Sequence, residues 1–363
     1  MQPPTKPKLT WKSVVFPLLG VLGFFLYIYL FHVNILGIIA TAKNADPVIY
    51  AVAILFGLLE VFFFTISWRV LANYLKIKIS VFRAYLYVWY GIYVDTIVPA
   101  QSVSGEVTRT YLCTRDKCGP FGKVVASLFA HRLLGMVLNV VALIAGLVLL
   151  TIGGEVNSLI FNALIFVAAA IVGIIGLMLT LSYKQQWTLK VINYITNLIH
   201  KITRGKWAPK NLQEQATEIT GHFHESMVEF SHNPKALVGS VFFLVVSWAF
   251  SLSIPFLVFE ALGHPVTWSI IIVTSAIFLA IKAIPIGIPF EVGLPEAVMT
   301  TLYISMGVYG PLAATATILV RIITLWMRFF IGFGAQQYLE LRPAANHGEP
   351  AAETEKTKIS PQP

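Results

Sequence analysis

Long apolar stretches, separated by short polar ones, run through most of the chain. The stretches are each close to or above the roughly 18–20 residues that a helix needs to cross the hydrocarbon core of a bilayer. Such blocks are too long for the core of a soluble domain and predict membrane-spanning helices. They are Val14–His32, Pro47–Val70, Val124–Thr151, Leu159–Leu181, Leu237–Leu262, Trp268–Ala283 and Leu312–Ala335.

Composition supports the same class. Of the 363 residues, 57% are hydrophobic and 12% are charged, whereas ordinary soluble domains carry roughly 25% charged residues. The mean hydropathy is +0.76. We expect an all-α polytopic membrane protein with about six full spans, because backbone groups in lipid must be satisfied within helices. The first apolar run continues to Ile39 and is longer than the apolar region of a signal peptide, so we interpret it as an uncleaved span.

The distribution of basic residues predicts the topology. Cytoplasmic loops carry an excess of Lys and Arg, and three lysines precede the first span. The stretches Arg69–Arg83 and Tyr183–Lys235 are also basic. We expect a cell-membrane protein with both termini cytoplasmic. Residues 1–341 form one integral membrane domain in this interpretation, and the Pro-, Ala-, Glu- and Lys-rich residues 342–363 form a disordered tail.

Two short apolar segments do not fit a simple crossing pattern. Residues 84–110 lie between the basic stretch Arg69–Arg83 and a second basic stretch that ends at Lys123. Both stretches are predicted to be cytoplasmic, so the segment between them must enter the membrane and return. Residues 266–308 must begin and end outside, because the span before them runs outward and the span after them runs back to the cytoplasmic tail. They contain a break rich in Pro and Gly. These two re-entrant candidates enter from opposite faces. The sequence therefore predicts an inverted repeat, and matching breaks in two halves are the sequence signature of a transporter binding site.

The cytoplasmic stretch between the spans contains two amphipathic segments. Apolar residues recur at helical spacing over residues 187–202 and 211–231, and glutamates occupy the opposite face of the second segment. Both segments are expected to lie as helices at the cytoplasmic membrane surface.

The candidate chemistry lies at the two broken segments. Free N–H groups at the start of a half-helix can hold an anion such as a phosphate. Arg132, Arg321 and Lys282 interrupt apolar runs, where a charge is expensive and needs a cavity or a partner. The acidic candidates are Glu106, Glu291 and Glu296, and Glu60 could join them. Proline kinks, structural ion pairs and snorkelling of Lys282 or Arg328 remain alternatives. The candidate substrate-binding residues are Pro99, Ser104, Gly105, Glu106, Arg109, Arg132, Lys282, Pro285, Glu291, Gly293, Glu296 and Arg321.

Other site types receive little support from the sequence. Cys113 and Cys118 form an isolated C-x4-C pair, which is a weak metal signal. No nucleophile elbow, P-loop or dinucleotide fingerprint occurs. The net charge of +9 is explained by cytoplasmic basic loops rather than by nucleic-acid binding. We expect no cofactor, no metal and no enzymatic activity.

The two broken stretches resemble the motifs of the lysylphosphatidylglycerol synthase transmembrane-region family, whose domains are flippase-like. The first motif matches Pro99, Gly105, Glu106, Arg109 and Arg132, and the second matches Pro285, Gly293, Glu296, Ala314, Ala316 and Arg321. The likeness covers roughly Trp11–Leu341. The second motif departs from the family where Pro289-Phe290 replace a common Gly-Gly. The resemblance implies a membrane domain that moves or holds a polar-headed lipid. The soluble aminoacyl-transferase domain of the synthases does not follow Leu341, so synthase activity is not expected.

These observations favour a translocase of an anionic-headed lipid or a lipid-linked glycan. Two alternatives stay open. The protein could be a secondary transporter whose glutamates take protons. It could also be a non-catalytic membrane subunit that docks a cytoplasmic enzyme through the Tyr183–Lys235 stretch.

Overall fold

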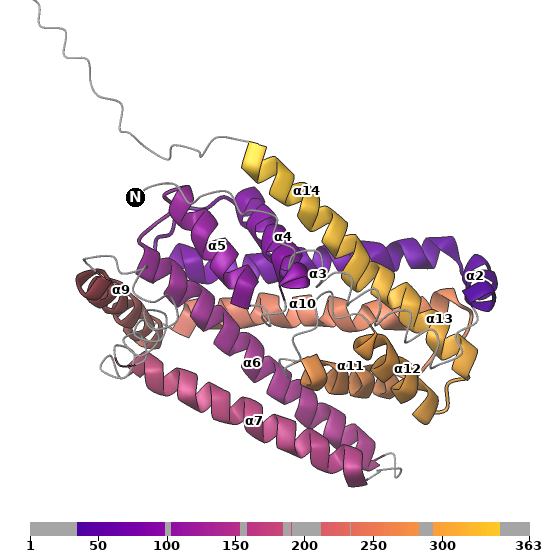
Figure 1. Ribbon diagram of the computed structural model, residues 1–363. Helices are drawn as coiled ribbons and strands as arrows, with labels where there is room; N and C mark the ends of the chain where they lie inside the picture. The colour runs from indigo at the N-terminus through magenta and orange to yellow at the C-terminus, as the bar shows by residue number, and fades with distance from the viewer. Residues whose placement is uncertain are drawn as a thin grey trace, which may run out of the picture.

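The computed structural model describes residues 35–98, 103–152, 158–183, 190, 212–232, 234–282 and 293–341. Within these ranges the protein is all helical (Figure 1). The helices are α2 (Ile35–Lys43), α3 (Pro47–Tyr74), α4 (Val81–Ile97), α5 (Val103–Arg115), α6 (Phe121–Ile152), α7 (Ser158–Tyr183), α9 (Leu212–His232), α10 (Pro234–Ala261), α11 (Trp268–Lys282), α12 (Leu294–Ser305), α13 (Gly310–Arg321), the π-helical η2 (Ile322–Met327) and α14 (Arg328–Leu341).

Four helices in the described part are long and apolar enough to cross a membrane. They are α3, most of α6, α10 and the continuous stretch Gly310–Leu341 formed by α13, η2 and α14. Each coincides with a predicted run, and the predicted run Leu159–Leu181 lies on the 26-residue α7. The polytopic all-α class is therefore confirmed. The first predicted span, Val14–His32, lies outside the described residues, as do the amphipathic segment 187–202, apart from Lys190, and the tail 342–363.

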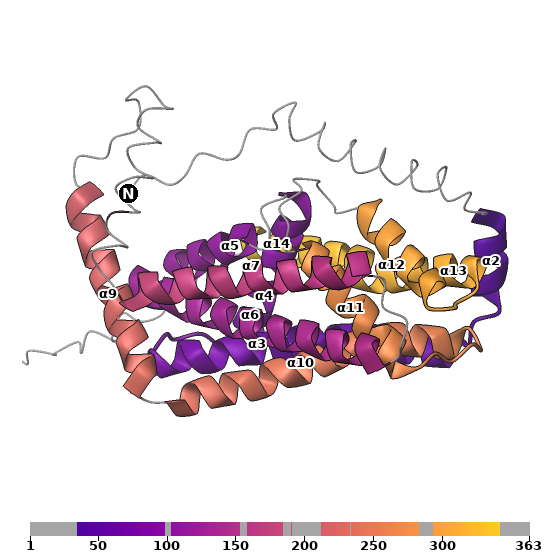
Figure 2. The ribbon, with the colours of Figure 1, turned by 90° about the horizontal axis from the view of Figure 1, so that it is seen from below.

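Helices α3 and α10 form the central pair, and they run side by side in both views (Figures 1 and 2). Small polar residues join them. The Ser67 hydroxyl lies 2.8 Å from the carbonyl oxygen of Ser240, and the Ser247 hydroxyl donates to the carbonyl of Glu60 at 2.9 Å. Small residues let helix backbones approach closely, and hydroxyls add interhelical hydrogen bonds in lipid. The pair is also fixed at one end, where the backbone N–H of Asp46, the N-cap of α3, donates to the carbonyl of Ala261 at 2.7 Å.

Both predicted re-entrant segments consist of two short helices. Helices α4 and α5 have 17 and 13 residues, and α11 and α12 have 15 and 12. All four are shorter than the roughly 20 residues of a full span. Within each pair the two helices contact each other. Residues 99–102 and 283–292, which join the helices of each pair, lie outside the described residues.

Helix α9 corresponds to the predicted amphipathic segment 211–231, and two of its apolar residues pack against other helices of the protein. It stands across one end of the bundle (Figure 2). The ring of Phe223 packs edge-on against Phe129 of α6, and the ring of Phe230 stacks on Tyr74 of α3. Phe223 and Phe230 are buried. These two apolar residues therefore pack on neighbouring helices.

The contact between α4 and α14 depends on Gly332. A β-carbon at this position would lie 2.6 Å from the backbone oxygen of Trp89 and 2.8 Å from the β-carbon of Tyr93. Backbone atoms cannot yield as a flexible side chain can. We expect Gly332→Ala to lower stability by about 1–3 kcal/mol, the usual range for overpacking. Thermal unfolding in detergent measures this, with Gly334→Ala as the matched control. Gly334 lies on the same helix and has nothing within 4 Å of the added carbon. Equal unfolding temperatures for both variants would contradict the close packing.

Candidate functional site

In the first half of the chain, Glu106 and Arg132 form an ion pair. Glu106 lies in the first turn of α5, and its Oε1 is 3.0 Å from Nη1 of Arg132 on α6. The two side chains are 22% and 23% exposed. An acidic residue in the first turn of a helix is favoured by the positive end of the helix dipole. This pair is therefore held by α5 and α6 together and remains partly accessible.

The start of α5 is held by Asp95 of α4, which the sequence analysis did not single out. Oδ1 of Asp95 accepts hydrogen bonds from the Ser104 hydroxyl at 2.5 Å and from the Gly105 backbone N–H at 2.7 Å. The Ser104 hydroxyl thus donates to a carboxylate from the neighbouring helix. The signal for Asp95 was present in the sequence, because it is an ionisable residue inside the apolar stretch Ala84–Ile97.

Gly105 is required where α5 crosses α4. A β-carbon at Gly105 would collide with the Asp95 carboxylate and would lie 2.9 Å from the backbone oxygen of Gly91. We expect Gly105→Ala to push α5 away from α4, to weaken the Asp95 hydrogen bonds and to lower stability by about 1–3 kcal/mol. Gly135→Ala on α6 is the control, because nothing lies within 4 Å of its added carbon. Thermal unfolding compares the two variants, and a Gly105→Ala protein as stable as the control would refute the close approach.

In the second half, Glu296 and Arg321 form a more deeply buried ion pair. Glu296 lies in the first turn of α12, and its Oε1 accepts a hydrogen bond from Nε of Arg321 at 2.6 Å. The side chains are 3% and 5% exposed. Oε2 of Glu296 also accepts from the backbone N–H of Gly293 at 2.7 Å. Gly293 has φ of +96°, a conformation that favours glycine, so the backbone at this position can turn into the helix.

The two ion pairs have the same plan. In each, a glutamate in the first turn of a short helix meets an arginine on a following long helix. The separation along the chain is 26 residues for Glu106 and Arg132 and 25 residues for Glu296 and Arg321. The correspondence is that expected of an internal repeat. The two pairs lie in different parts of the bundle, since α5 packs chiefly on α4 and α6 and α12 chiefly on α13 and α11 (Figure 1).

A third ion pair, partly buried, joins Glu60 of α3 to Arg328 of α14. The sequence analysis left open whether Arg328 snorkels to the interface, and the structure places it against this carboxylate. Arg321 and Arg328 flank the π-helical η2. A π-helical turn changes the register of a helix and is frequent at functional sites. Here it separates the two arginines that reach Glu296 and Glu60.

Arg109 is buried beneath aromatic rings. Its guanidinium carbon lies 5.3 Å from the ring centre of Trp68 and 5.9 Å from that of Phe64. The ring of His131 also lies edge-on to Phe64, at 4.6 Å between ring centres. Arg109 was predicted from the sequence to be a site residue, whereas His131 was not. A histidine beside Arg132 in an apolar run was visible in the sequence but gave no indication of its partner.

The remaining candidates are only partly placed. Pro99, Pro285 and Glu291 lie outside the described residues. Lys282 is the last residue of α11, and its side chain is not described. Their relation to the ion pairs stays a prediction.

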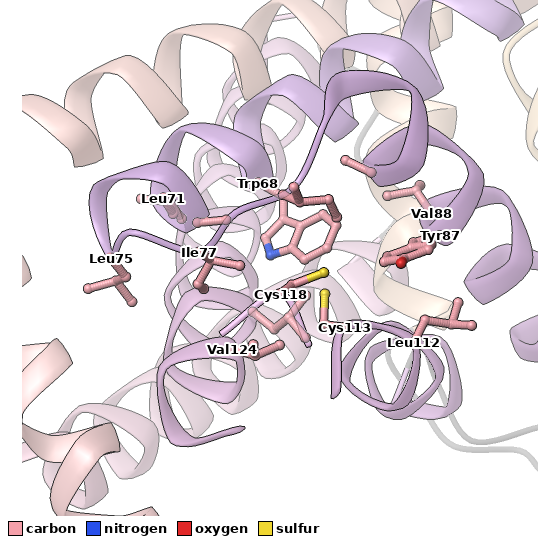
Figure 3. Close-up of a cluster of buried hydrophobic side chains, with 14 of the residues drawn as sticks. Trp68, Leu71, Leu75, Ile77, Tyr87, Val88, Leu112, Cys113, Cys118 and Val124 are labelled. Carbon is pink, nitrogen blue, oxygen red and sulfur yellow. The ribbon is translucent and has the colours of Figure 1, made fainter. Parts of the chain in front are cut away.

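The two cysteines lie beside Trp68 with their sulfur atoms close together (Figure 3). Both are free and buried. A hydrogen bond from Cys113 lowers the pKa of the Cys118 thiol, in the turn between α5 and α6, below its ordinary value. Among the described residues, no cluster of three or more His, Cys, Asp or Glu side chains could hold a metal ion.

One family model and two membrane proteins match most of this chain. Residues 14–332 match the family described as the lysylphosphatidylglycerol synthase TM region. A UPF0104 membrane protein of Pyrococcus horikoshii is 25% identical over 294 residues, covering 80% of this chain and 86% of the relative. A UPF0104 membrane protein of Methanothermobacter thermautotrophicus is 22% identical over 301 residues, covering 82% of this chain and 87% of the relative.

Proposed function

Because the chain belongs to the lysylphosphatidylglycerol synthase TM-region family, we propose that it is a translocase for an anionic-headed lipid or a lipid-linked glycan. The proposal assigns binding and movement of the head group to the protein and no covalent chemistry. It places the protein in the cell membrane with both termini cytoplasmic, as the basic loops indicate.

The observation that carries this proposal is the pair of matched Glu–Arg contacts. A charge inside a membrane segment is expensive and is usually tied to a ligand pathway or to a partner. Each arginine here is held by a glutamate at the start of a short helix, where an anion is also favoured. An anionic head group can take the place of the carboxylate at the guanidinium, since both present oxygen acceptors to the same planar donors.

The unequal burial of the two pairs supports a two-sided pathway. Glu106 and Arg132 are about a fifth exposed, whereas Glu296 and Arg321 are almost fully enclosed. Alternating access requires one half of a repeat to open while the other closes. The half that contains α5 is the open one in this interpretation.

The docking alternative is disfavoured by one observation. Its proposed surface was the Tyr183–Lys235 stretch, in which Phe223 and Phe230 pack on α6 and α3. The secondary-transporter alternative is distinguished from the lipid proposal by an uptake experiment. It predicts uptake of a soluble substrate driven by a proton gradient, while the lipid proposal predicts none.

Native mass spectrometry of the purified protein tests the proposal. We expect the wild-type protein to retain an anionic lipid or lipid-linked glycan, and Arg132→Gln to retain less of it at equal protein folding. The control is Lys117→Gln, which removes an exposed positive charge next to the α5–α6 turn. Retention of neutral lipids only, by all three proteins, would contradict the proposal.

A further inference from the structure

Two deeply buried nitrogen atoms near the first ion pair have no hydrogen-bond partner among the described residues. They are Nη1 of Arg109 and Nε2 of His131. Arg109 is 6% exposed and His131 is 3% exposed. A buried polar atom without a partner carries a substantial desolvation penalty, so each such atom in a folded protein requires an explanation.

The two groups belong to one region rather than to separate defects. Both contact the ring of Phe64 on α3, Arg109 by its guanidinium and His131 by its imidazole. Arg109 comes from α5 and His131 from α6, so three helices converge here. The positive charge of Arg109 also acts directly on His131. Arg109 and His131 therefore approach the same ring of α3 from two different helices.

The rings of Phe64 and Trp68 hold the guanidinium of Arg109 in place, and Nη1 of Arg109 is left without an acceptor among the described residues. The indole N–H of Trp68 donates to the Ser127 hydroxyl at 3.2 Å, and that hydroxyl donates to the backbone oxygen of Val124 at 2.7 Å. Trp68 is therefore fixed, and the guanidinium of Arg109 lies over its ring. Stacking uses the face of a guanidinium, whereas its N–H groups lie at the edge and remain free to bind an acceptor.

The surrounding charges indicate what kind of acceptor fits. Asp95 is used by Ser104 and Gly105, and Glu106 is used by Arg132. Asp95, Glu106 and Arg132 all interact electrostatically with Arg109. The formal charges of these two carboxylates and two guanidiniums sum to zero. A ligand with one negative charge is therefore easier to accommodate than one with several, because excess buried charge is expensive.

We propose that Arg109 and His131 form a subsite for the phosphate group of a singly charged phosphate ester. Nη1 of Arg109 and an N–H at Nε2 of His131 each donate to a phosphate oxygen, and Phe64 and Trp68 form the apolar wall beside it. A neutral imidazole can donate from one ring nitrogen, so His131 needs no charge for this role. The inference deepens the proposed function: it names the chemistry of the head group and a contact site next to the Glu106–Arg132 pair.

Equilibrium binding to the full-length protein in a neutral detergent tests the subsite. The probes are dihexanoyl phosphatidylglycerol as a phosphodiester lipid, inorganic phosphate, hexanoate as a carboxylate and dihexanoylglycerol as an uncharged lipid. We expect the phosphodiester lipid to bind to the wild type. Arg109→Gln and His131→Leu are each expected to raise its dissociation constant about tenfold or more, as loss of a charge-assisted hydrogen bond does.

Two further variants separate binding from folding. His131→Gln keeps an N–H donor and is expected to bind the phosphodiester lipid more tightly than His131→Leu. If the ring served only for packing, the two variants would bind the lipid equally. Lys117→Gln, on the exposed surface, is expected to bind like the wild type. If Arg109→Gln does not fold, Arg109→Lys is used, which keeps the charge but lacks the planar fork, and weaker binding is again expected.

The outcomes are separable from those of the proposed function. Binding of the phosphodiester lipid that is insensitive to Arg109 and His131 overturns the subsite even if lipid translocation occurs. Equal Arg109-dependent binding of hexanoate overturns the assignment to phosphate. Arg109-dependent binding of inorganic phosphate without the lipid overturns the assignment to a phosphate ester, and the translocation assay still tests the proposed function separately.

Discussion

Arg321→Ala is expected to destabilise the folded protein by about 3–5 kcal/mol, the range found when one partner of a buried ion pair is removed. The reason is that Glu296, 3% exposed, would keep its charge without its guanidinium partner. The hydrogen bond from the Gly293 backbone N–H remains, but one neutral donor does not compensate a buried carboxylate. Thermal unfolding in detergent and the yield of monodisperse protein measure the loss.

A double variant provides the control for Arg321→Ala. Glu296→Gln combined with Arg321→Leu removes both charges and leaves no buried carboxylate. Replacing a buried ion pair by neutral groups of similar size is often nearly neutral. We expect the double variant to be clearly more stable than Arg321→Ala. If the two unfold at the same temperature, the Glu296–Arg321 contact does not dominate the stability of α12 and α13.

Arg132→Gln is expected to slow head-group movement by about tenfold or more while the protein stays folded. The side chain is 23% exposed, so Glu106 can be solvated when its partner is lost. The penalty to folding is therefore smaller than in the second half. The effect on transport should be large, because charge-assisted contacts to an anion are among the strongest that a protein makes. The rate of lipid movement in proteoliposomes measures the effect, and the unfolding temperature reports the fold.

Lys117→Gln is the matched control for Arg132→Gln, since it removes one positive charge from an exposed position. We expect its translocation rate to equal that of the wild type. An Arg132→Gln protein that moves lipid as fast as the control would remove the first ion pair from the mechanism, whatever its role in packing.

The spans could be predicted because they depend on composition alone. Pro47–Val70 and Leu237–Leu262 are apolar over more than the thickness of the hydrocarbon core, and α3 and α10 follow them closely. The partners of Glu106 and Glu296 were less predictable. The sequence indicated which acidic residues could pair with Arg132 and Arg321, but the pairing depends on how two helices more than twenty residues apart pack.

The missed residues depend on tertiary contacts in the same way. Asp95 accepts from the start of α5 only because Gly91 and Gly105 let α4 and α5 approach closely. His131 is significant only because Phe64 of α3 lies against both its ring and the guanidinium of Arg109. No spacing in the sequence encodes these contacts. An acidic residue or a histidine inside an apolar run is nevertheless a usable signal, since such residues in membrane segments have a partner or a function.

The accessibility of a head-group-labelled anionic lipid in proteoliposomes tests the central claim most directly. The label is bleached by an impermeant reductant, with and without an imposed proton gradient. The account predicts that wild-type protein makes the inner-leaflet label accessible, and that Arg132→Gln, folded to the same extent, does so far more slowly. Bleaching that stops at the outer-leaflet fraction with wild-type protein under both conditions would contradict the account.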